Sequence, residues 1–209
     1  MERPASEPRF FRDATDDRKG EILDAAVAVF SEKGYDAGSM REIAELVGVS
    51  EPALYRHFSS KEDICLALIT GVSARIKSEV GPLLAAAEPA HIAETFETIF
   101  VNRTVAVGSY LPVVRTVMIA SMHSPVFRTA FRESVADPIL ARLERLVPVV
   151  DAYYGIEADA EDVSTRVRTL LSMFVGQFIT AFVLGDELTS PTDTFMRVMG
   201  WTEHTAASA

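Results

Sequence analysis

Side chains that can contact nucleic acid are concentrated in one short part of the sequence, residues 39–61. Hydroxyl, basic and aromatic groups are interspersed with apolar residues there. Such groups bind phosphate oxygens, and arginine also pairs with base edges. The residues that we expect to contact DNA are Ser39, Arg41, Ser50, Glu51, Pro52, Ala53, Tyr55, Arg56, His57 and Lys61.

Local signals predict a helix that begins after Ser39. Glu42 follows Ser39 by three residues, which is the spacing of a capping box. The next apolar residues recur at helical spacing: Met40, Ile43, Ala44 and Val47. Gly48 can adopt a positive φ and is therefore expected to end this helix abruptly.

Two further helices are expected directly after that turn. Ser50 caps a short helix over residues 51–57, in which Pro52 is early enough to be tolerated. Ser60 caps a third helix. Two short helices joined by a glycine turn make a helix-turn-helix, whose second helix can lie in the major groove of DNA.

The helix-turn-helix divides the candidate residues into two kinds of contact. Arg41, together with Arg56 or Glu51, is expected to face base edges. The expected phosphate contacts flank the groove: Tyr55, His57 and Lys61. The amide groups of the helix after Ser60 add a positive end that favours a phosphate.

The same segment resembles the TetR family of bacterial transcriptional regulators. The residues that carry the resemblance are Val49-Ser50-x-x-Ala53-Leu54-Tyr55-x-His57-Phe58-x-Ser60-Lys61-Glu62-Asp63, where the family often reads Val-Ser-x-Gly-Thr-Leu-Tyr-x-His-Phe-x-Ser-Lys-Glu. The match covers residues 17–70. Pro52 stands where glycine is frequent, and Ala53 stands where threonine is frequent. The family threonine often touches a phosphate through its hydroxyl, and Ala53 has no hydroxyl.

The charge of the chain argues against DNA binding, whereas the motif argues for it. The formal net charge is −10, and residues 1–64 carry nine basic against fourteen acidic side chains. DNA-binding domains are usually basic. Because the spacing of a motif is more specific than a net charge, we give the motif more weight. We expect weak non-specific affinity for DNA that depends steeply on salt.

Composition and hydropathy predict a cytoplasmic, soluble, all-α protein that has no membrane segment. The single cysteine, Cys65, excludes an internal disulfide framework, and the N-terminus lacks the apolar run of a signal peptide. No stretch has 18 uninterrupted apolar residues. The expected divisions are a flexible arm at 1–16, a helix-turn-helix DNA-binding domain at 17–64, a ligand-binding and dimerisation domain at 65–203, and a tail at 204–209.

Helical periodicity continues through the rest of the chain, and no strand pattern or internal repeat is visible. A first helix over 19–33 ends at Gly34, and the helix after Ser60 runs to Gly81-Pro82. Pro138 is expected to kink or split its helix. The further expected helices are 91–107, 110–122, 125–147, 161–185 and 191–201.

The helix over 161–185 is apolar almost all round from Leu170, so it needs a partner on every side. One interpretation is a homodimer in which this helix and the helix over 191–201 pair with their copies. The resemblance implies the same four-helix arrangement. The expected interface residues are Leu171, Val175, Gly176, Ile179, Phe182, Val183, Phe195 and Met199. The alternative is a helix at the centre of a monomeric core.

The middle helices are rich in phenylalanine and methionine, which favours either an ordinary core or a pocket for an apolar molecule. The resemblance implies an effector cavity between these helices. The expected lining is Phe96, Phe100, Arg103, Met118, Met122, His123, Phe127, Phe131, Phe174, Gln177 and Phe178. The polar members of this set would orient the ligand.

No catalytic constellation is visible, so we expect no enzyme, no cofactor and no metal. The sequence lacks a phosphate-binding glycine loop and a His-Glu-x-x-His pair, and its four histidines are far apart. Cys65 is expected to face a core, which suits packing better than nucleophilic catalysis.

These observations predict a ligand-responsive regulator that binds a double-stranded DNA operator as a homodimer. We expect a repressor that a small apolar or amphipathic effector releases from a palindromic operator. The alternative is a helical small-molecule or lipid-binding protein that no longer binds DNA.

Overall fold

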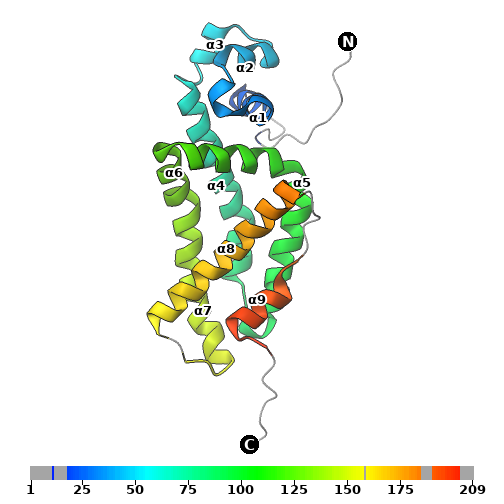
Figure 1. The fold of residues 1–209 in the computed structure, drawn as a ribbon, viewed down its shortest axis with the longest axis vertical. Helices are drawn as coiled ribbons and strands as arrows, with labels where there is room; N and C mark the ends of the chain where they lie inside the picture. The colour runs from blue at the N-terminus through cyan, green and yellow to red at the C-terminus, as the bar shows by residue number, and fades with distance from the viewer. Residues whose placement is uncertain (1–10, 12–17, 158, 185–189, 203–209) are drawn as a thin grey trace, which may run out of the picture. The chain divides into compact units, whose positions relative to one another are not determined.

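The computed structural model describes residues 11, 18–157, 159–184 and 190–202, and of residues 101–111, 178 and 181–184 it describes the backbone alone. These parts of the chain are helical and contain no strand, which confirms the all-α class (Figure 1). The helices are α1 (Arg18–Ala37), α2 (Met40–Val47), α3 (Glu51–Tyr55), α4 (Lys61–Ala85), a 3₁₀ turn (Pro89–His91), α5 (Ile92–His123), α6 (Pro125–Phe131), a π-helical turn (Arg132–Ala136), α7 (Asp137–Tyr153), α8 (Ala160–Leu184) and α9 (Thr192–Met199). Apart from Phe11, the expected arm at 1–16 and tail at 204–209 lie outside the described residues.

The chain forms two compact units, each of which draws on separate parts of the sequence. The head unit contains residues 1–76 and 105–136, and the second unit contains residues 77–104 and 137–209. Helices α4 and α5 therefore contribute residues to both units. This division differs from the linear boundary that we expected between residues 64 and 65.

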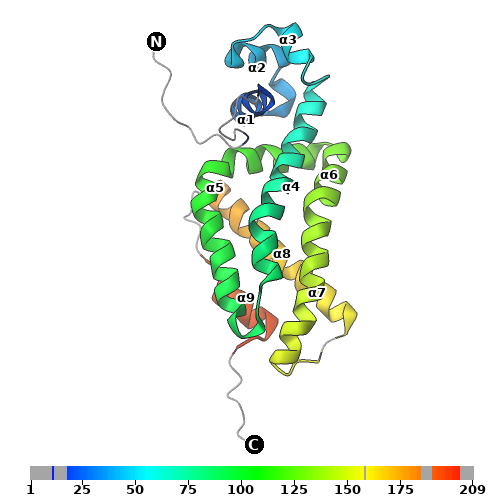
Figure 2. The same ribbon diagram turned by 180° about the vertical axis from the view of Figure 1, so that it is seen from behind.

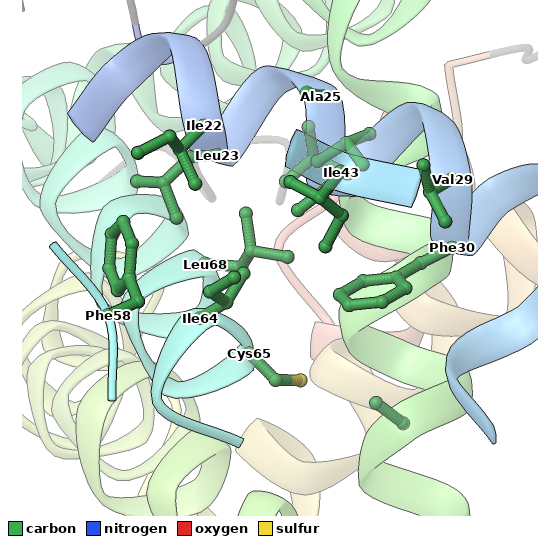
Figure 3. Packing of buried hydrophobic residues seen from close by; sticks show 14 of the residues in the cluster. Ile22, Leu23, Ala25, Val29, Phe30, Ile43, Phe58, Ile64, Cys65 and Leu68 are labelled. Atoms are coloured by element: carbon green, nitrogen blue, oxygen red, sulfur yellow. The ribbon is translucent and has the colours of Figure 1, made fainter. Parts of the chain in front are cut away.

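The core of the head unit explains why residues 105–136 belong to it. Figure 3 shows side chains of α1, α2 and α4 that point toward one another, among them the fully buried Ile22, Ile43 and Leu68. Val117 of α5 and Phe127 of α6 are buried in the same apolar cluster. A three-helix head could not bury all of its apolar surface alone, and the two later helices cover what remains.

Two glycines set the geometry of the helix-turn-helix. Gly34 has a φ of 81° and kinks α1, which then continues to Ala37 instead of ending at residue 33. Gly48 has a φ of 78°, and its N–H donates to the carbonyls of Ala44 and Glu45, which ends α2 as the sequence predicts. The capping box of Ser39 and Glu42 is also confirmed.

Two prolines that we expected near helix ends lie inside helices in the structure. Helix α4 continues past Pro82 to Ala85, and α5 is one helix with Pro112 inside it. Proline has a φ close to the helical value, so the main loss is one hydrogen bond. We expected two helices where α5 is continuous.

Pro138 interrupts its helix, as the sequence predicts. It has no N–H to donate to the carbonyl of Ser134, four residues earlier. A π-helical turn precedes it, and the hydroxyl of Ser73 from α4 donates to the Ser134 carbonyl at 2.6 Å. The buried hydroxyl therefore satisfies the acceptor that proline leaves unpaired.

The second unit packs around aromatic rings and one buried polar network. The ring of Phe96 on α5 contacts those of Phe195 on α9 and Trp201, which is where α9 lies along the first part of α5 (Figure 2). The guanidinium of Arg166 on α8 donates two hydrogen bonds to the Asp151 carboxylate, at 2.8 and 2.9 Å. Trp201 Nε1 donates to the same carboxylate at 2.7 Å. This network joins α7, α8 and the chain after α9.

Within the described residues, no helix is both long enough and apolar enough to cross a membrane.

Candidate nucleic-acid interface

Helix α3 is held from one side, which leaves its other side for a partner. Leu54 is the buried residue of α3, and Phe58 directly after the helix is buried as well. The Ser50 hydroxyl accepts from the Ala53 N–H at 3.4 Å and caps the helix. Pro52, Tyr55 and Arg56 are exposed, whereas Glu51, Ala53 and His57 are half-buried. The outward side of α3 and the residue after it thus present a proline, an aromatic ring and a basic group to solvent.

At the start of α2, Ser39 and Glu42 form hydrogen bonds to each other in both directions. The Ser39 hydroxyl accepts from the Glu42 N–H at 3.3 Å and donates to Glu42 Oε2 at 2.8 Å. Lys33 forms an ion pair with the same carboxylate. The hydrogen bonds from Lys33 and then Ser39 lower the pKa of Glu42 to about 2. We expected Ser39 to contact DNA. In this structure its hydroxyl hydrogen is donated to the Glu42 carboxylate instead.

Arg41 is exposed on the first turn of α2 and remains a candidate base reader. Its Nε forms an ion pair with Glu45 Oε1, four residues later, at 2.9 Å. The hydrogen bond and charge of Glu45 raise the pKa of Arg41, with a smaller contribution from Glu51. Both partners of the ion pair are exposed to solvent, so separating them costs little free energy.

The Lys61 ammonium lies among backbone carbonyls of the head unit, whereas the sequence predicted that it contacts a phosphate. Its Nζ donates to the backbone carbonyls of Tyr35, Asp36 and Gly38, at 2.7, 3.0 and 3.0 Å, and the predicted phosphate contact itself stays a prediction. It also lies 4.5 Å from the centre of the Tyr35 ring. An ammonium group has three N–H donors, and all three are directed at the end of α1.

The first turn of α4 is likewise less suited to phosphate than we expected. Glu62 and Asp63 both lie in this turn. The Ser59 N–H donates to Asp63 Oδ2 at 2.9 Å, and the Asp63 N–H donates to the Ser60 hydroxyl at 3.0 Å. Two carboxylates at the positive end of a helix repel a third anion.

One exposed residue of the head was missing from our expected set. Leu46 is a large apolar side chain that is exposed on α2. Its signal in the sequence is weak, because it lies beside Glu45 on the polar face of an otherwise regular amphipathic helix. An exposed apolar side chain near a reading helix can contact a thymine methyl group.

The residues expected to line an effector pocket are divided between the two units. Met118, Met122, His123, Phe127 and Phe131 belong to the head unit, and Phe96, Phe100, Phe174 and Gln177 belong to the second unit. The side chains of Arg103 and Phe178 lie outside the described residues. Met122 is 72% exposed and His123 is exposed as well, so neither is enclosed in this structure.

Several of the remaining aromatic members are packed against other aromatic rings. The rings of Phe100 and Phe174 are 6.0 Å apart, and those of Phe174 and Phe195 are 4.8 Å apart. Phe127 contacts Tyr35 at 5.0 Å in the core of the head unit. These distances are typical of close-packed aromatic pairs.

The head unit contains a pocket at a place that we did not expect. It has a volume of about 250 Å³ and lies between residues 30–35 of α1 and Arg115, Thr116 and Ile119 of α5. The kink at Gly34 helps to form it. None of its lining residues belongs to the expected effector set.

The expected dimer residues fall into four groups. Val175 and Ile179 on α8 are exposed, and Leu171 and Gly176 are half-buried. Phe195 and Met199 are buried in the core of the second unit, which corrects the expectation that they face a partner. The side chains of Phe182 and Val183 lie outside the described residues. Val198 of α9 is exposed instead, and we had not expected it.

The titratable groups offer little for catalysis in the part of the chain that the structure describes. No three histidine, cysteine, aspartate or glutamate side chains gather closely enough there to hold a metal. Burial, and then the charge of Glu62, raise the pKa of Cys65 to about 12, so the thiol stays protonated. A protonated, buried thiol is a packing group and a poor nucleophile.

The fold defines a class: all-helical proteins that carry a helix-turn-helix near the start of the chain. Residues 22–68 match the model of the bacterial regulatory proteins of the tetR family. These residues, which run from α1 into α4, are thus similar to the tetR family of regulators.

Two curated relatives match a segment of about a quarter of the chain. It is 52% identical over 54 residues to the HTH-type transcriptional activator FasR of Mycolicibacterium smegmatis, which covers 26% of this chain and 25% of FasR. It is 43% identical over 54 residues to the HTH-type transcriptional repressor KstR2 of Mycobacterium tuberculosis, covering 26% of this chain and 27% of KstR2. The matched part thus spans about a quarter of each curated relative.

A solved structure extends the likeness to the whole fold. The transcriptional regulator FadR from Bacillus subtilis, solved in complex with stearoyl-CoA, matches with a TM-score of 0.70. The match covers 88% of this chain and 98% of FadR at 17% sequence identity. At this level of identity the likeness establishes the fold alone.

Proposed function

We propose that the protein is a DNA-binding transcriptional regulator that reads its operator through α2 and α3. The observation that carries this proposal is the outward side of α3, which Leu54 and Phe58 hold in place from beneath. With α3 in the major groove, Arg56 and Glu51 would meet base edges, and Arg41 would reach them from α2. Tyr55 and His57 would contact phosphates beside the groove.

The proposed regulator acts as a homodimer. Val175 and Ile179 of α8 and Val198 of α9 are exposed apolar side chains that a second copy would cover. A Cβ built on Gly176 meets no heavy atom of the described residues within 4 Å, so a partner helix could approach closely there. Two heads whose reading helices are about 34–36 Å apart would read a palindromic operator.

We further propose that a small apolar or amphipathic effector releases the regulator from DNA. The phenylalanine-rich interior of the second unit supports an apolar ligand. Because these rings are packed, the ligand would select a minor state in which they part. A ligand that prefers this state weakens operator binding by its differential affinity for the two states. Stearoyl-CoA is the first probe that we would test, since FadR was solved with it.

A gel-shift experiment with DNA fragments flanking the protein's own gene tests the proposal. A regulator should shift at least one fragment at a salt concentration where an unrelated fragment stays free. Adding stearoyl-CoA should reverse the shift if an acyl thioester is the effector. If stearoyl-CoA raises the melting temperature while no fragment binds, the alternative of a helical small-molecule carrier is favoured.

The sign of regulation needs a separate measurement, since one relative is an activator and another a repressor. We propose repression. A reporter gene behind the bound fragment should be expressed more strongly when the regulator is deleted. Weaker expression would indicate an activator.

A further inference from the structure

We propose that Lys61 is a positioning residue and not a ligand of DNA phosphate. Its hydrogen bonds to the carbonyls of Tyr35, Asp36 and Gly38, which we call the clasp, connect the end of the helix-turn-helix to its beginning. Lys61 is the first residue of α4, and residues 56–60 separate it from the end of α3. Its ammonium group binds the chain just before Ser39, where α2 begins. One side chain therefore connects the two ends of the segment that contains both motif helices. The inference rests on the DNA-binding function proposed above.

The carbonyls that Lys61 binds have a particular need for a donor. The last carbonyls of a helix lack intrahelical partners, and the end of a helix carries a partial negative charge. Tyr35 and Asp36 belong to the last turn of α1, and Gly38 follows it. A lysine ammonium satisfies three such acceptors at once and stabilises the negative end of the helix.

The backbone at Gly38 leaves little freedom around this clasp. A Cβ built on Gly38 would lie 2.8 Å from a ring carbon of Phe30 and 3.0 Å from a methyl carbon of Val29. The turn is thus pressed against α1 on one side and bound by Lys61 on the other. The next residue, Ser39, caps α2, so the place where α2 begins depends on this turn.

The clasp also connects to the later helices of the head unit. The Tyr35 ring lies under the Lys61 ammonium and meets the ring of Phe127 of α6 edge-on at 5.0 Å. Lys61 is therefore attached to the packed core of the head unit. A change in the turn would be transmitted to α2 and, through Gly48, to α3.

Two variants of Lys61 separate positioning from phosphate binding. Lys61→Met keeps the length of the side chain and removes its charge. Lys61→Arg keeps the charge, but a planar guanidinium cannot direct three donors as the ammonium does. A phosphate ligand would tolerate arginine, whereas the clasp would not. Val72→Ala is the control, because Val72 is a buried α4 residue away from the turn and its loss lowers stability alone.

The first measurement is the salt dependence of binding to a selected operator and to random DNA. We expect both Lys61 variants to lose about tenfold in the ratio of operator to random affinity, with an unchanged slope of log K against log salt. A slope reduced by about one unit, with both affinities falling together, would make Lys61 a phosphate ligand and overturn the proposal. A ratio equal to that of Val72→Ala would also overturn it, because only stability would then have changed.

The second measurement needs no DNA. Hydrogen exchange should accelerate at the amides of residues 36–42 in both Lys61 variants and stay near the wild-type rate there in Val72→Ala. Exchange that accelerates uniformly across the head unit would contradict the clasp. If the wild-type protein binds no operator, the proposed function fails, while this exchange experiment still decides the role of Lys61.

Discussion

Replacing Asp151 with alanine should destabilise the second unit more than any surface change nearby. Asp151 is 2% exposed, and its carboxylate accepts two hydrogen bonds from Arg166 and one from Trp201. Losing the charge-assisted bonds costs about 1.5–3 kcal/mol, and leaving the indole N–H unpaired costs about 1–3 kcal/mol. Breaking a buried pair by removing one partner typically costs about 3–5 kcal/mol in total. We expect a loss of that size in the free energy of unfolding.

Asp162→Ala is the matched control, because Asp162 is the other acidic partner of Arg166. The Asp162 side chain is 53% exposed, and its contact with the guanidinium is 3.3 Å long. An exposed pair of this kind contributes about 0–1 kcal/mol. The two variants remove the same type of group from the same arginine, so their difference isolates burial.

Urea unfolding provides the assay. Trp201 is the single tryptophan of the chain and is 1% exposed, so its fluorescence reports the unfolding of the second unit. Because Asp151→Ala changes the environment of the indole, midpoints and slopes should be compared, with circular dichroism as a second probe. If Asp151→Ala and Asp162→Ala shift the midpoint equally, the reasoning about the buried network is wrong.

Three further predictions concern the head and the dimer. The pKa of Glu42 is lowered from 4.5 to about 2, so its stabilisation of α2 should be complete above pH 4.5 and lost as the pH falls toward 2. The difference in the free energy of unfolding between wild type and Glu42→Gln should therefore shrink over that range. A constant difference would contradict a lowered pKa of Glu42. Ile179 is 47% exposed, and Ile179→Glu should convert the proposed dimer into a species of 22.9 kDa in sedimentation, whereas Thr169→Glu, at an exposed position, should not. A wild-type monomer at micromolar concentration would remove the basis of this test. Arg41→Ala should weaken operator binding by about 1–3 kcal/mol if Arg41 pairs with guanine; an unchanged ratio of operator to random affinity would exclude that pairing.

The sequence predicts the head well because its signals are local. The capping box at Ser39, the positive φ at Gly48 and the cap at Ser50 each involve residues within four positions of one another. Helix ends of this kind depend on hydrogen bonds that the neighbouring side chains specify. The interruption at Pro138 is predictable for the same reason, since the missing N–H is a property of that residue alone.

Lys61 shows why the tertiary contacts of side chains were harder to predict than the helices. A lysine in the first turn of a helix beside a DNA-binding motif has the type and place of a phosphate ligand. Its actual partners are the carbonyls at the end of α1, which no local pattern connects to it. The buried pair of Asp151 and Arg166 was missed for a similar reason, because its partners come from different helices.

The dimer residues of α9 illustrate the limit of apolar periodicity. A short helix with apolar residues on two sides does not reveal which side faces its own core. The structure buries Phe195 and Met199 and exposes Val198. Likewise, a phenylalanine-rich sequence does not distinguish a packed core from a ligand cavity, and in this structure the rings are in contact.

The measurement that tests the central claim most directly is selection of bound DNA from a random pool by the full-length protein. If α2 and α3 read DNA in a dimer, successive rounds should enrich one palindromic sequence whose half-sites are centred about 10 base pairs apart, or a multiple of that distance. Arg56→Ala should relax the preference at one position in each half-site. A pool that shows no shared sequence, at a salt concentration low enough for non-specific binding to be detected, would contradict the account.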